Sequence, residues 1–221
     1  QAFPNSGEID PATIVRVLSK TAVRVSPDCG VSQPNFPDKP IEGYPAPIRA
    51  PSFCAGCPHG RSTQVIEGSR ALAGIGCHGM AMMLDPTKTN TISHMGGEGA
   101  MWIGQQPFTD EKHVFTNMGD GTYFHSGFLA IRAAVAAKLP ITYKLLVNGF
   151  VSMTGGQAIE GELSIDQIVS ELDAEGVKKI ALVSDEPEKY SGHEFPRSLT
   201  IHERTQLETV QKDFREYNNV S

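Results

Sequence analysis

Apolar runs of strand length alternate with helical patterns through the second half of the chain. Residues 113–118 and 141–147 are short apolar runs, and residues 124–138 between them carry apolar side chains at helical spacing. The pattern continues with a helical stretch over 164–175 and an apolar run over 179–184. Strands that alternate with helices favour a parallel sheet with right-handed crossovers and helices on both faces. The predicted fold is an α/β three-layer sandwich with a mostly parallel sheet.

The two ends of the chain show different patterns. Residues 11–18 have helical spacing behind Asp10, a residue type that caps helices, whereas seven prolines between 26 and 51 prevent a long helix or strand. Residues 205–217 have the spacing of an amphipathic helix. We expect an N-terminal helix with a proline-rich connector (1–50), a central domain (51–195) and a C-terminal helical tail (196–221).

Composition excludes several classes of protein. The chain has 221 residues, 39% of them hydrophobic, with a formal net charge of −6, which suits one sizeable core. It has neither a basic cluster for nucleic acid nor an apolar run of about 20 residues for a membrane. Four cysteines do not form a disulfide framework, which favours the cytoplasm. Because the chain starts at Gln1 without a signal pattern, we expect a piece of a longer or processed protein.

Glycine and cysteine are concentrated in the middle of the chain. Of the 22 glycines, 16 lie between Cys54 and Gly156, as do three of the four cysteines. Gly119-Asp120-Gly121 stands where a predicted strand meets a predicted helix, and Asn148 ends the next strand. Oxygen ligands at neighbouring strand ends suit Mg²⁺ or Ca²⁺, and glycines before a helix N-terminus suit a diphosphate. The segment predicts a metal and diphosphate site; the alternative is a simple tight turn.

The Gly-Asp-Gly segment followed by Asn148 after 26 residues resembles the thiamine diphosphate motif of thiamine-dependent enzymes. The motif of that family often ends in Asn-Asn, whereas Gly149 follows Asn148 here. The resemblance implies a thiamine diphosphate-binding fold of the PP type for 51–195, and Mg²⁺ held by Asp120, Asn148 and the backbone carbonyl of Phe150. The residues that it places at the cofactor are Gly119, Asp120, Gly121, Thr122, Asn148, Phe150, Met153 and Thr154.

Four further segments resemble the 2-oxoacid:ferredoxin oxidoreductases, most specifically the long, fused indolepyruvate type. They are SFCAGCPH (52–59), GIGCH (74–78), HMGGEG (94–99) and SMTGGQ (152–157), within a resemblance that covers about 50–190. The resemblance implies oxidative decarboxylation of a 2-oxo acid to an acyl-coenzyme A, with electrons passed through an iron–sulfur centre to ferredoxin. No motif reports which 2-oxo acid is used.

The resemblance also implies an iron–sulfur site. It makes Cys54, Cys57 and Cys77 three ligands of a [4Fe–4S] cluster. Three thiols are also compatible with zinc or with no metal. The candidates for a fourth ligand are Cys29, His59, His78 and a cysteine of a partner domain.

His94, His59 and Glu98 are the candidate catalytic residues. Histidine changes charge near neutral pH, so one of them could relay protons or hydrogen-bond a substrate oxyanion. Either histidine could instead satisfy a buried hydrogen bond. Glu98 could instead be the N-terminal charge of a helix that starts near Ala100.

One requirement of thiamine enzymes lies outside the chain. The resemblance implies that a carboxylate on a second, pyrimidine-binding domain activates the cofactor, and 221 residues with one motif set leave little room for that domain. We expect it on another domain or subunit, with a dimer in the full enzyme. Two alternatives stay open: a zinc–thiolate scaffold domain, and a thiamine diphosphate-dependent decarboxylase without a cluster.

Overall fold

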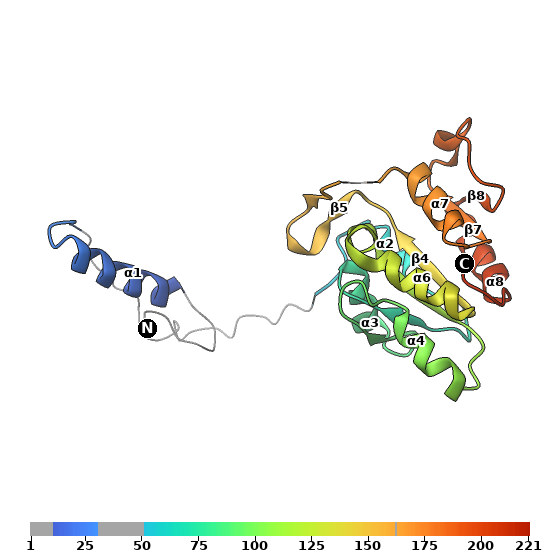
Figure 1. Ribbon diagram of the computed structural model, residues 1–221, viewed down its shortest axis with the longest axis horizontal. Helices are drawn as coiled ribbons and strands as arrows, with labels where there is room; N and C mark the ends of the chain where they lie inside the picture. Colours follow the sequence, from blue (N-terminus) through green and yellow to red (C-terminus); the bar gives the residue numbers. More distant parts are fainter. Residues whose placement is uncertain (1–10, 31–50, 162) are drawn as a thin grey trace. The chain divides into compact units, whose positions relative to one another are not determined.

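The computed structural model describes residues 11–30, 51–161 and 163–221 (Figure 1). Contacts divide the chain into two units, 1–49 and 50–221, and each is considered by itself. In the first unit α1 (Pro11–Val25) is longer than the predicted 11–18. Most of the predicted proline-rich connector, from 31 to 50, lies outside the described residues.

The main sheet of the second unit has four parallel strands in the order β2-β1-β3-β4. Strands β3 and β4 pair in register from Val114↔Ile141 to Gly119↔Leu146. They lie within one residue of the predicted runs, and the parallel α/β prediction is confirmed. Strands β1 and β2 have only three and four residues, too few for an apolar run to stand out. The strands are β1 (Ala71–Ala73), β2 (Thr89–Ile92), β3 (Val114–Gly119) and β4 (Ile141–Leu146).

A second, smaller sheet contains β7 (Ile180–Ser184) and β8 (Leu199–Glu203), which pair in parallel. The sequence placed the strand at 179–184 in one sheet with β4, and this is corrected: β7 bonds to β8. The edge of β4 that would face β7 is instead bonded, at its start, to residues 220 and 221. The predicted helical tail over 196–221 is corrected in part, because it begins with β8.

Seven helices of the second unit are described, and most are short. The helix predicted over 164–175 is confirmed as α7, and the one over 205–217 as the shorter α8. The helices are α2 (His59–Ser62), α3 (Ala81–Leu84), α4 (Ala100–Gln105), α5 (Asp120–Thr122), α6 (Phe128–Ala137), α7 (Ile165–Ala174) and α8 (Leu207–Arg215). Single 3₁₀ turns lie at Cys77–Met80, Gln106–Phe108, Ser152–Thr154, Pro187–Tyr190 and Arg204–Gln206.

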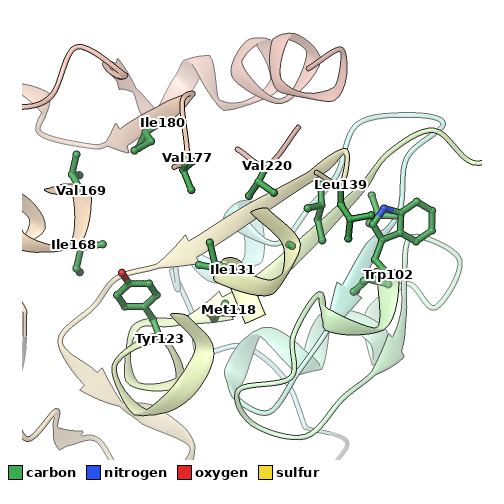
Figure 2. Close-up of a cluster of buried hydrophobic side chains, with 14 residues drawn as sticks. Trp102, Met118, Tyr123, Ile131, Leu139, Ile168, Val169, Val177, Ile180 and Val220 are labelled. Carbon is green, nitrogen blue, oxygen red and sulfur yellow. The ribbon is translucent and has the colours of Figure 1, made fainter. Parts of the chain in front are cut away.

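The core has two parts, one on each face of the main sheet. Val114 and Met118 of β3 pack with Ile131 of α6 in the larger cluster. Phe115, which points to the opposite face, packs with Val65 and the neighbouring Ile66. Figure 2 shows the larger cluster extending from Trp102 and Leu139 at one end to Tyr123 and Ile168 at the other. Side chains therefore cover both faces of the sheet, as the three-layer prediction requires.

None of the helices among the described residues combines the length and the apolar character needed to cross a membrane.

Candidate functional site

All four strands of the main sheet have their carboxyl ends on the same side of the sheet, which we call the strand edge. Each strand is followed there by one of the predicted motif segments. Gly74–Cys77 follows β1, His94–Gly99 comes two residues after β2, Asp120 follows β3, and Asn148 comes two residues after β4. Carboxyl ends of parallel strands lie side by side, and this edge is where α/β sheets bind ligands. The fold therefore gathers four segments that span 75 positions of the sequence, from 74 to 148.

Asp120 joins the ends of β3 and β4. Its buried carboxylate accepts hydrogen bonds through Oδ2 from the backbone N–H of Asn148 and of Gly149, both at 2.6 Å. Oδ1 accepts from Gly121 N at 2.9 Å. Three N–H donors hold the carboxylate in one orientation at the strand edge. The segments predicted to share a metal site, 119–121 and 148–150, are thus in direct contact.

The segment after β4 folds back as a small hairpin of β5 (Phe150–Val151) and β6 (Gln157–Ala158). The Asn148 side chain shapes its start, because Oδ1 accepts from Phe150 N at 2.8 Å. A Cβ on Gly121 would lie 3.1 Å from Val151 Cγ2, so the glycine permits this close approach. Of the predicted cofactor residues in the hairpin, Phe150 and Met153 are more than half exposed.

A π turn, Tyr123–Gly127, interrupts the helix that follows Asp120. The sequence predicted one helix over 124–138, whereas the structure has α5, this π turn and α6 in succession from 120 to 137. The π turn brings Ser126 against the glycine segment after β2: a Cβ on Gly96 would overlap the Ser126 side chain. Such insertions are frequent at functional sites. Thr122, predicted to contact the cofactor, is buried in α5.

The three predicted cluster cysteines lie within electrostatic range of one another. Burial raises the pKa of the Cys77 thiol, and the neighbouring Cys57 and Cys54 raise it further. Cys57 Sγ lies 3.5 Å from His59 Nδ1. In the described ranges, however, no group of three or more His, Cys, Asp or Glu side chains is arranged to hold a metal ion. The cysteines are gathered without forming a preorganised metal site.

His59 and His78 connect the cysteine region with Asp120. Burial lowers the pKa of His59, the Asp120 charge raises it, and Arg204 lowers it. The pKa of His78 falls to about 4 through burial and the charge of His59. The His78 ring fits against Gly76 and Gly119, and its Nε2 has no hydrogen-bond partner among the described residues. Both rings are therefore held largely neutral beside the strand edge.

Glu98 and His94 occupy the other end of the edge. The Glu98 side chain has no exposed surface: Oε2 accepts from Gly96 N at 2.7 Å, and Oε1 has no partner in the part of the chain that the structure describes. Burial raises the pKa of Glu98. A Cβ on Gly74 would overlap the Glu98 carboxyl, and one on Gly97 would lie 2.7 Å from the His94 ring. These two candidates thus contact the glycine segments, and none of the hydrogen bonds of Asp120 among the described residues involves either of them.

Three cations hold the cysteine-bearing segment by its backbone carbonyls. Arg204 Nη2 donates to Pro58 O at 3.0 Å, and Lys144 Nζ to Gln64 O at 2.8 Å. Arg215 Nη1 donates to Glu67 O at 3.1 Å. Burial lowers the pKa of Lys144 to about 7. None of these three residues could be picked out from the sequence, because each is 80 or more positions from the carbonyl that it binds.

A family comparison identifies the domain around this edge. Residues 74–183 match the family described as thiamine pyrophosphate enzyme, C-terminal TPP binding domain, where TPP is thiamine diphosphate. These residues belong to that TPP-binding family. The matched range contains the four strand-end segments, whereas Cys54, Cys57 and Arg204 lie outside it.

Curated relatives of the TPP-binding domain are indolepyruvate oxidoreductase subunits IorA. The subunit from Methanothermobacter marburgensis is 28% identical over 154 residues, which cover 65% of this chain and 25% of the relative. The subunit from Pyrococcus horikoshii is 31% identical over 134 residues, 52% of this chain and 20% of the relative. The chain therefore spans about a quarter or less of the length of these two relatives.

A solved structure shares the fold of the TPP-binding domain. It is a 2-oxoglutarate:ferredoxin oxidoreductase from Magnetococcus marinus, with 2-oxoglutarate, coenzyme A and succinyl-CoA bound. The match has a TM-score of 0.58 at 18% identity and covers 79% of this chain and 63% of that one.

The residues at the strand edge fit a magnesium–diphosphate group. The Asp120 carboxylate, the Asn148 amide oxygen and the Phe150 backbone carbonyl are hard oxygen donors of the kind that Mg²⁺ prefers. Asp120 and Asn148 stand at neighbouring strand ends, and Gly121 leaves no side chain between the helix start and the hairpin. The chemistry of these donors and the space left by Gly121 are compatible with such a group.

Proposed function

We propose that this domain binds TPP with Mg²⁺ at the strand edge and serves as the cofactor-binding part of a 2-oxo acid oxidoreductase of the indolepyruvate type. The observation that carries the proposal is the Asp120 carboxylate, which accepts backbone N–H groups from the end of β4 and so fixes the two predicted metal-binding segments together. The family match and the IorA relatives support it. TPP, when bound, supplies the carbon nucleophile and electron sink for decarboxylating a 2-oxo acid.

The residues of this chain would bind and orient that group. Asp120, Asn148 and the Phe150 carbonyl would hold the Mg²⁺, and the N-terminus of the helix that starts at Asp120 would face the diphosphate with its positive dipole end. Gly119, Thr122, Met153 and Thr154 would form the surrounding wall. Burial lowers the pKa of His59 and so favours its neutral form, which would serve as the proton acceptor at the edge beside the Asp120 charge. His94 and Glu98 would contribute as catalytic residues from the end of the strand edge that follows β2.

The whole enzyme requires parts beyond this domain. We propose a pyrimidine-binding domain or subunit, a dimer, coenzyme A as acyl acceptor and ferredoxin as electron acceptor, in the cytoplasm. The IorA relatives are named as subunits, and the solved structure of similar fold is a ferredoxin oxidoreductase with coenzyme A bound. An aryl 2-oxo acid is the substrate class that the names of the relatives suggest.

Calorimetric titration with TPP and Mg²⁺ tests the cofactor site. We expect saturable binding to the parent chain and binding at least about tenfold weaker, equivalent to about 1.4 kcal/mol, for Asp120→Ala. Asp110→Ala, which removes an exposed carboxylate away from the strand edge, is the matched control. Asn148→Ala provides a second variant with an exposed side chain in case Asp120→Ala fails to fold. Equal affinity of the parent and both site variants would refute the proposal.

We propose that Cys54, Cys57 and Cys77 bind a [4Fe–4S] cluster whose fourth ligand comes from Cys29, His59, His78 or a partner. The effect of Cys57 and Cys54 on the pKa of the Cys77 thiol supports this, because it places the three thiols near one another, and Cys57 Sγ already contacts His59. Iron, sulfide and zinc analysis of anaerobically prepared protein tests it. Brown protein with iron and sulfide is the expected result. Stoichiometric zinc in colourless protein would favour a zinc–thiolate scaffold, and colourless protein that binds TPP and Mg²⁺ but contains no iron, sulfide or zinc would favour a cluster-free decarboxylase.

A further inference from the structure

A cavity of about 430 Å³ lies beside β2, the outer strand of the main sheet. Residues of β2, of α4 and of the turn after α4 line it, together with Arg70 in front of β1. None of the candidate cofactor, metal or catalytic residues is among the lining residues, so the cavity is distinct from the site at the strand edge. We call it the α4 cavity. Its lining includes Arg70, Asn90, Thr91, Trp102, Gln105 and Phe108.

Two side chains of α4 that line the cavity each carry a buried polar atom without a partner. Trp102 Nε1 and Gln105 Oε1 are inaccessible to water and form no hydrogen bond within the part of the chain that the structure describes. Because the two residues are three positions apart, they share one face of the helix. One atom is an N–H donor and the other a carbonyl acceptor. A ligand that offers an acceptor beside a donor would satisfy both, and buried polar atoms favour such a partner strongly.

The charge at the α4 cavity is already balanced. Arg70 Nε donates to both carboxylate oxygens of Glu111, at 3.0 and 2.8 Å, and Nη1 donates to Asn90 Oδ1 at 3.1 Å. The guanidinium also lies over the Trp102 ring, 5.5 Å from the ring centre. No other charged residue lines the cavity. A neutral ligand therefore suits it better than a carboxylate or a phosphate, which would compete with Glu111 for the guanidinium.

The outer strand is bulged where it borders the α4 cavity. Thr91 has a φ of 58°, a left-handed conformation that β-branched residues rarely adopt. The register of β2 against β1 shifts at this residue. Neighbouring residues of a regular strand point to opposite faces, whereas Asn90 and Thr91 both line the cavity. The bulge thus turns two adjacent polar side chains to one site, a use of bulges and of backbone strain that is frequent at binding sites.

Phe108 offers an aromatic ring at the α4 cavity. It ends the turn after α4, and its side chain is 90% exposed. Trp102, by contrast, is fully buried at one end of the larger core cluster (Figure 2). A flat ring stacked on Phe108 would remove apolar surface from water on both partners. The cavity therefore combines an exposed aromatic face with a donor and an acceptor that lack partners.

We propose that the α4 cavity binds the neutral base of a small nucleoside or nucleotide, a flat ring with an N–H donor beside a ring acceptor. The base would stack on Phe108, accept from Trp102 Nε1 and donate to Gln105 Oε1, once the Gln105 and Phe108 side chains turn to admit it. An aliphatic amide would form the same hydrogen bonds without the stacking, and a phenyl ring would stack without the hydrogen bonds. The inference does not rest on the proposed cofactor site.

Intrinsic fluorescence tests the α4 cavity, because Trp102 is the only tryptophan of the chain. Adenosine is compared with purine riboside, which has the same ring without the amino group that would donate to Gln105. We expect a saturable change in Trp102 emission with adenosine and about tenfold weaker binding of purine riboside. Gln105→Leu removes the acceptor, so it should lower the affinity for adenosine to that for purine riboside.

Two further variants separate stacking from general effects on the fold. Phe108→Ala should weaken the binding of both nucleosides about tenfold, because it removes the ring on which the base stacks. Met83→Ala is the matched control, since Met83 is an exposed apolar side chain outside the lining of the cavity. It should leave both affinities unchanged.

Each outcome decides the proposal. A preference for adenosine that disappears in Gln105→Leu, together with weaker binding of both nucleosides to Phe108→Ala, supports it. The absence of a saturable change in emission with adenosine overturns it, as does a preference that persists in Gln105→Leu or an affinity that Phe108→Ala leaves unaltered. Saturating TPP with Mg²⁺ should not affect adenosine binding. Competition between them would place the nucleoside at the strand edge and overturn the proposal, while leaving the proposed cofactor site intact.

Discussion

Asp120 and Glu98 are two buried carboxylates with opposite surroundings. Asp120 accepts three backbone N–H groups, which compensate its charge. Glu98 Oε2 accepts a hydrogen bond from the backbone N–H of Gly96, whereas Oε1 has no hydrogen-bond partner among the described residues. Both residues could be singled out from the sequence, because each lies among glycines. The difference between their surroundings could not be predicted, because it depends on the hydrogen-bond donors that the folded chain places around each carboxylate.

Replacing Glu98 by glutamine is expected to change how stability depends on pH. Burial raises the folded pKa of Glu98, so its stabilising contribution is fully present below the unfolded pKa and is lost as pH rises through the folded one. We therefore expect Glu98→Gln to be more stable than the parent at pH 8, by about 1 kcal/mol, and to lose this advantage at acidic pH. Urea unfolding at several pH values measures it, with the exposed Glu188→Gln as control. A difference in unfolding free energy between Glu98→Gln and the parent that stays the same at every pH would contradict a raised pKa for Glu98.

At the scale of elements, local signals predicted what forms but not what pairs. Helix α7 was predicted from its helical spacing, and the strand at 179–184 from its apolar run. The pairing of β7 with β8 rests on a segment that the sequence did not mark as a strand. The hold of Arg204 on Pro58 is likewise a contact between distant elements. Neither leaves a local pattern.

Ser164 is expected to contribute to stability through the start of α7. Its Oγ accepts from Gln167 N at 3.3 Å while Gln167 Oε1 accepts from Ser164 N at 2.9 Å, a complete capping box. Ser164→Ala should lower the free energy of unfolding by about 1 kcal/mol. Chemical denaturation measures the change, and the exposed Ser191→Ala should be near neutral. Equal stability of the two variants would mean that the cap adds little.

Arg204 is expected to steady the segment that carries the cysteines. It donates to Pro58 O and, through Nη1, to Asp185 Oδ2 at 2.7 Å. Arg204→Ala should speed amide exchange in residues 54–64 by about tenfold in metal-free protein, because the segment loses a charge-assisted bond. Removal of the exposed Arg197 is the control. Exchange rates that stay equal in both variants would show that the segment holds itself in place.

The core of the second unit joins the main sheet to the sheet of β7 and β8. The chain end lies between them: Val220 belongs to the larger core cluster together with Ile141 of β4 and Ile180 of β7. The family match ends at 183, before β8 and the chain end. Strand β8 and the residues that pair with the start of β4 therefore lie outside the matched range.

Shortening Val220 should weaken the whole domain. Its side chain is 2% exposed, so Val220→Ala should cost about 1.5–3 kcal/mol of unfolding free energy through lost burial. Val147→Ala, at a site 44% exposed on the loop after β4, should cost much less. Thermal unfolding of the two variants measures the difference. A loss no greater than that of the control would show that the chain end does not contribute to the core.

The sequence by itself determined the α/β class, strands β3 and β4, helices α6 and α7, and the residue types at the strand edge. These features follow from local periodicity, glycine placement and the spacing from Asp120 to Asn148, because interactions between residues close in sequence determine them. Only the tertiary structure decided that Asp120 binds the backbone of Asn148, that β7 pairs with β8, and that Ser221 lies on β4. Those contacts join positions 19 to 80 residues apart, where the choice of partner depends on burial and edge pairing across the folded domain.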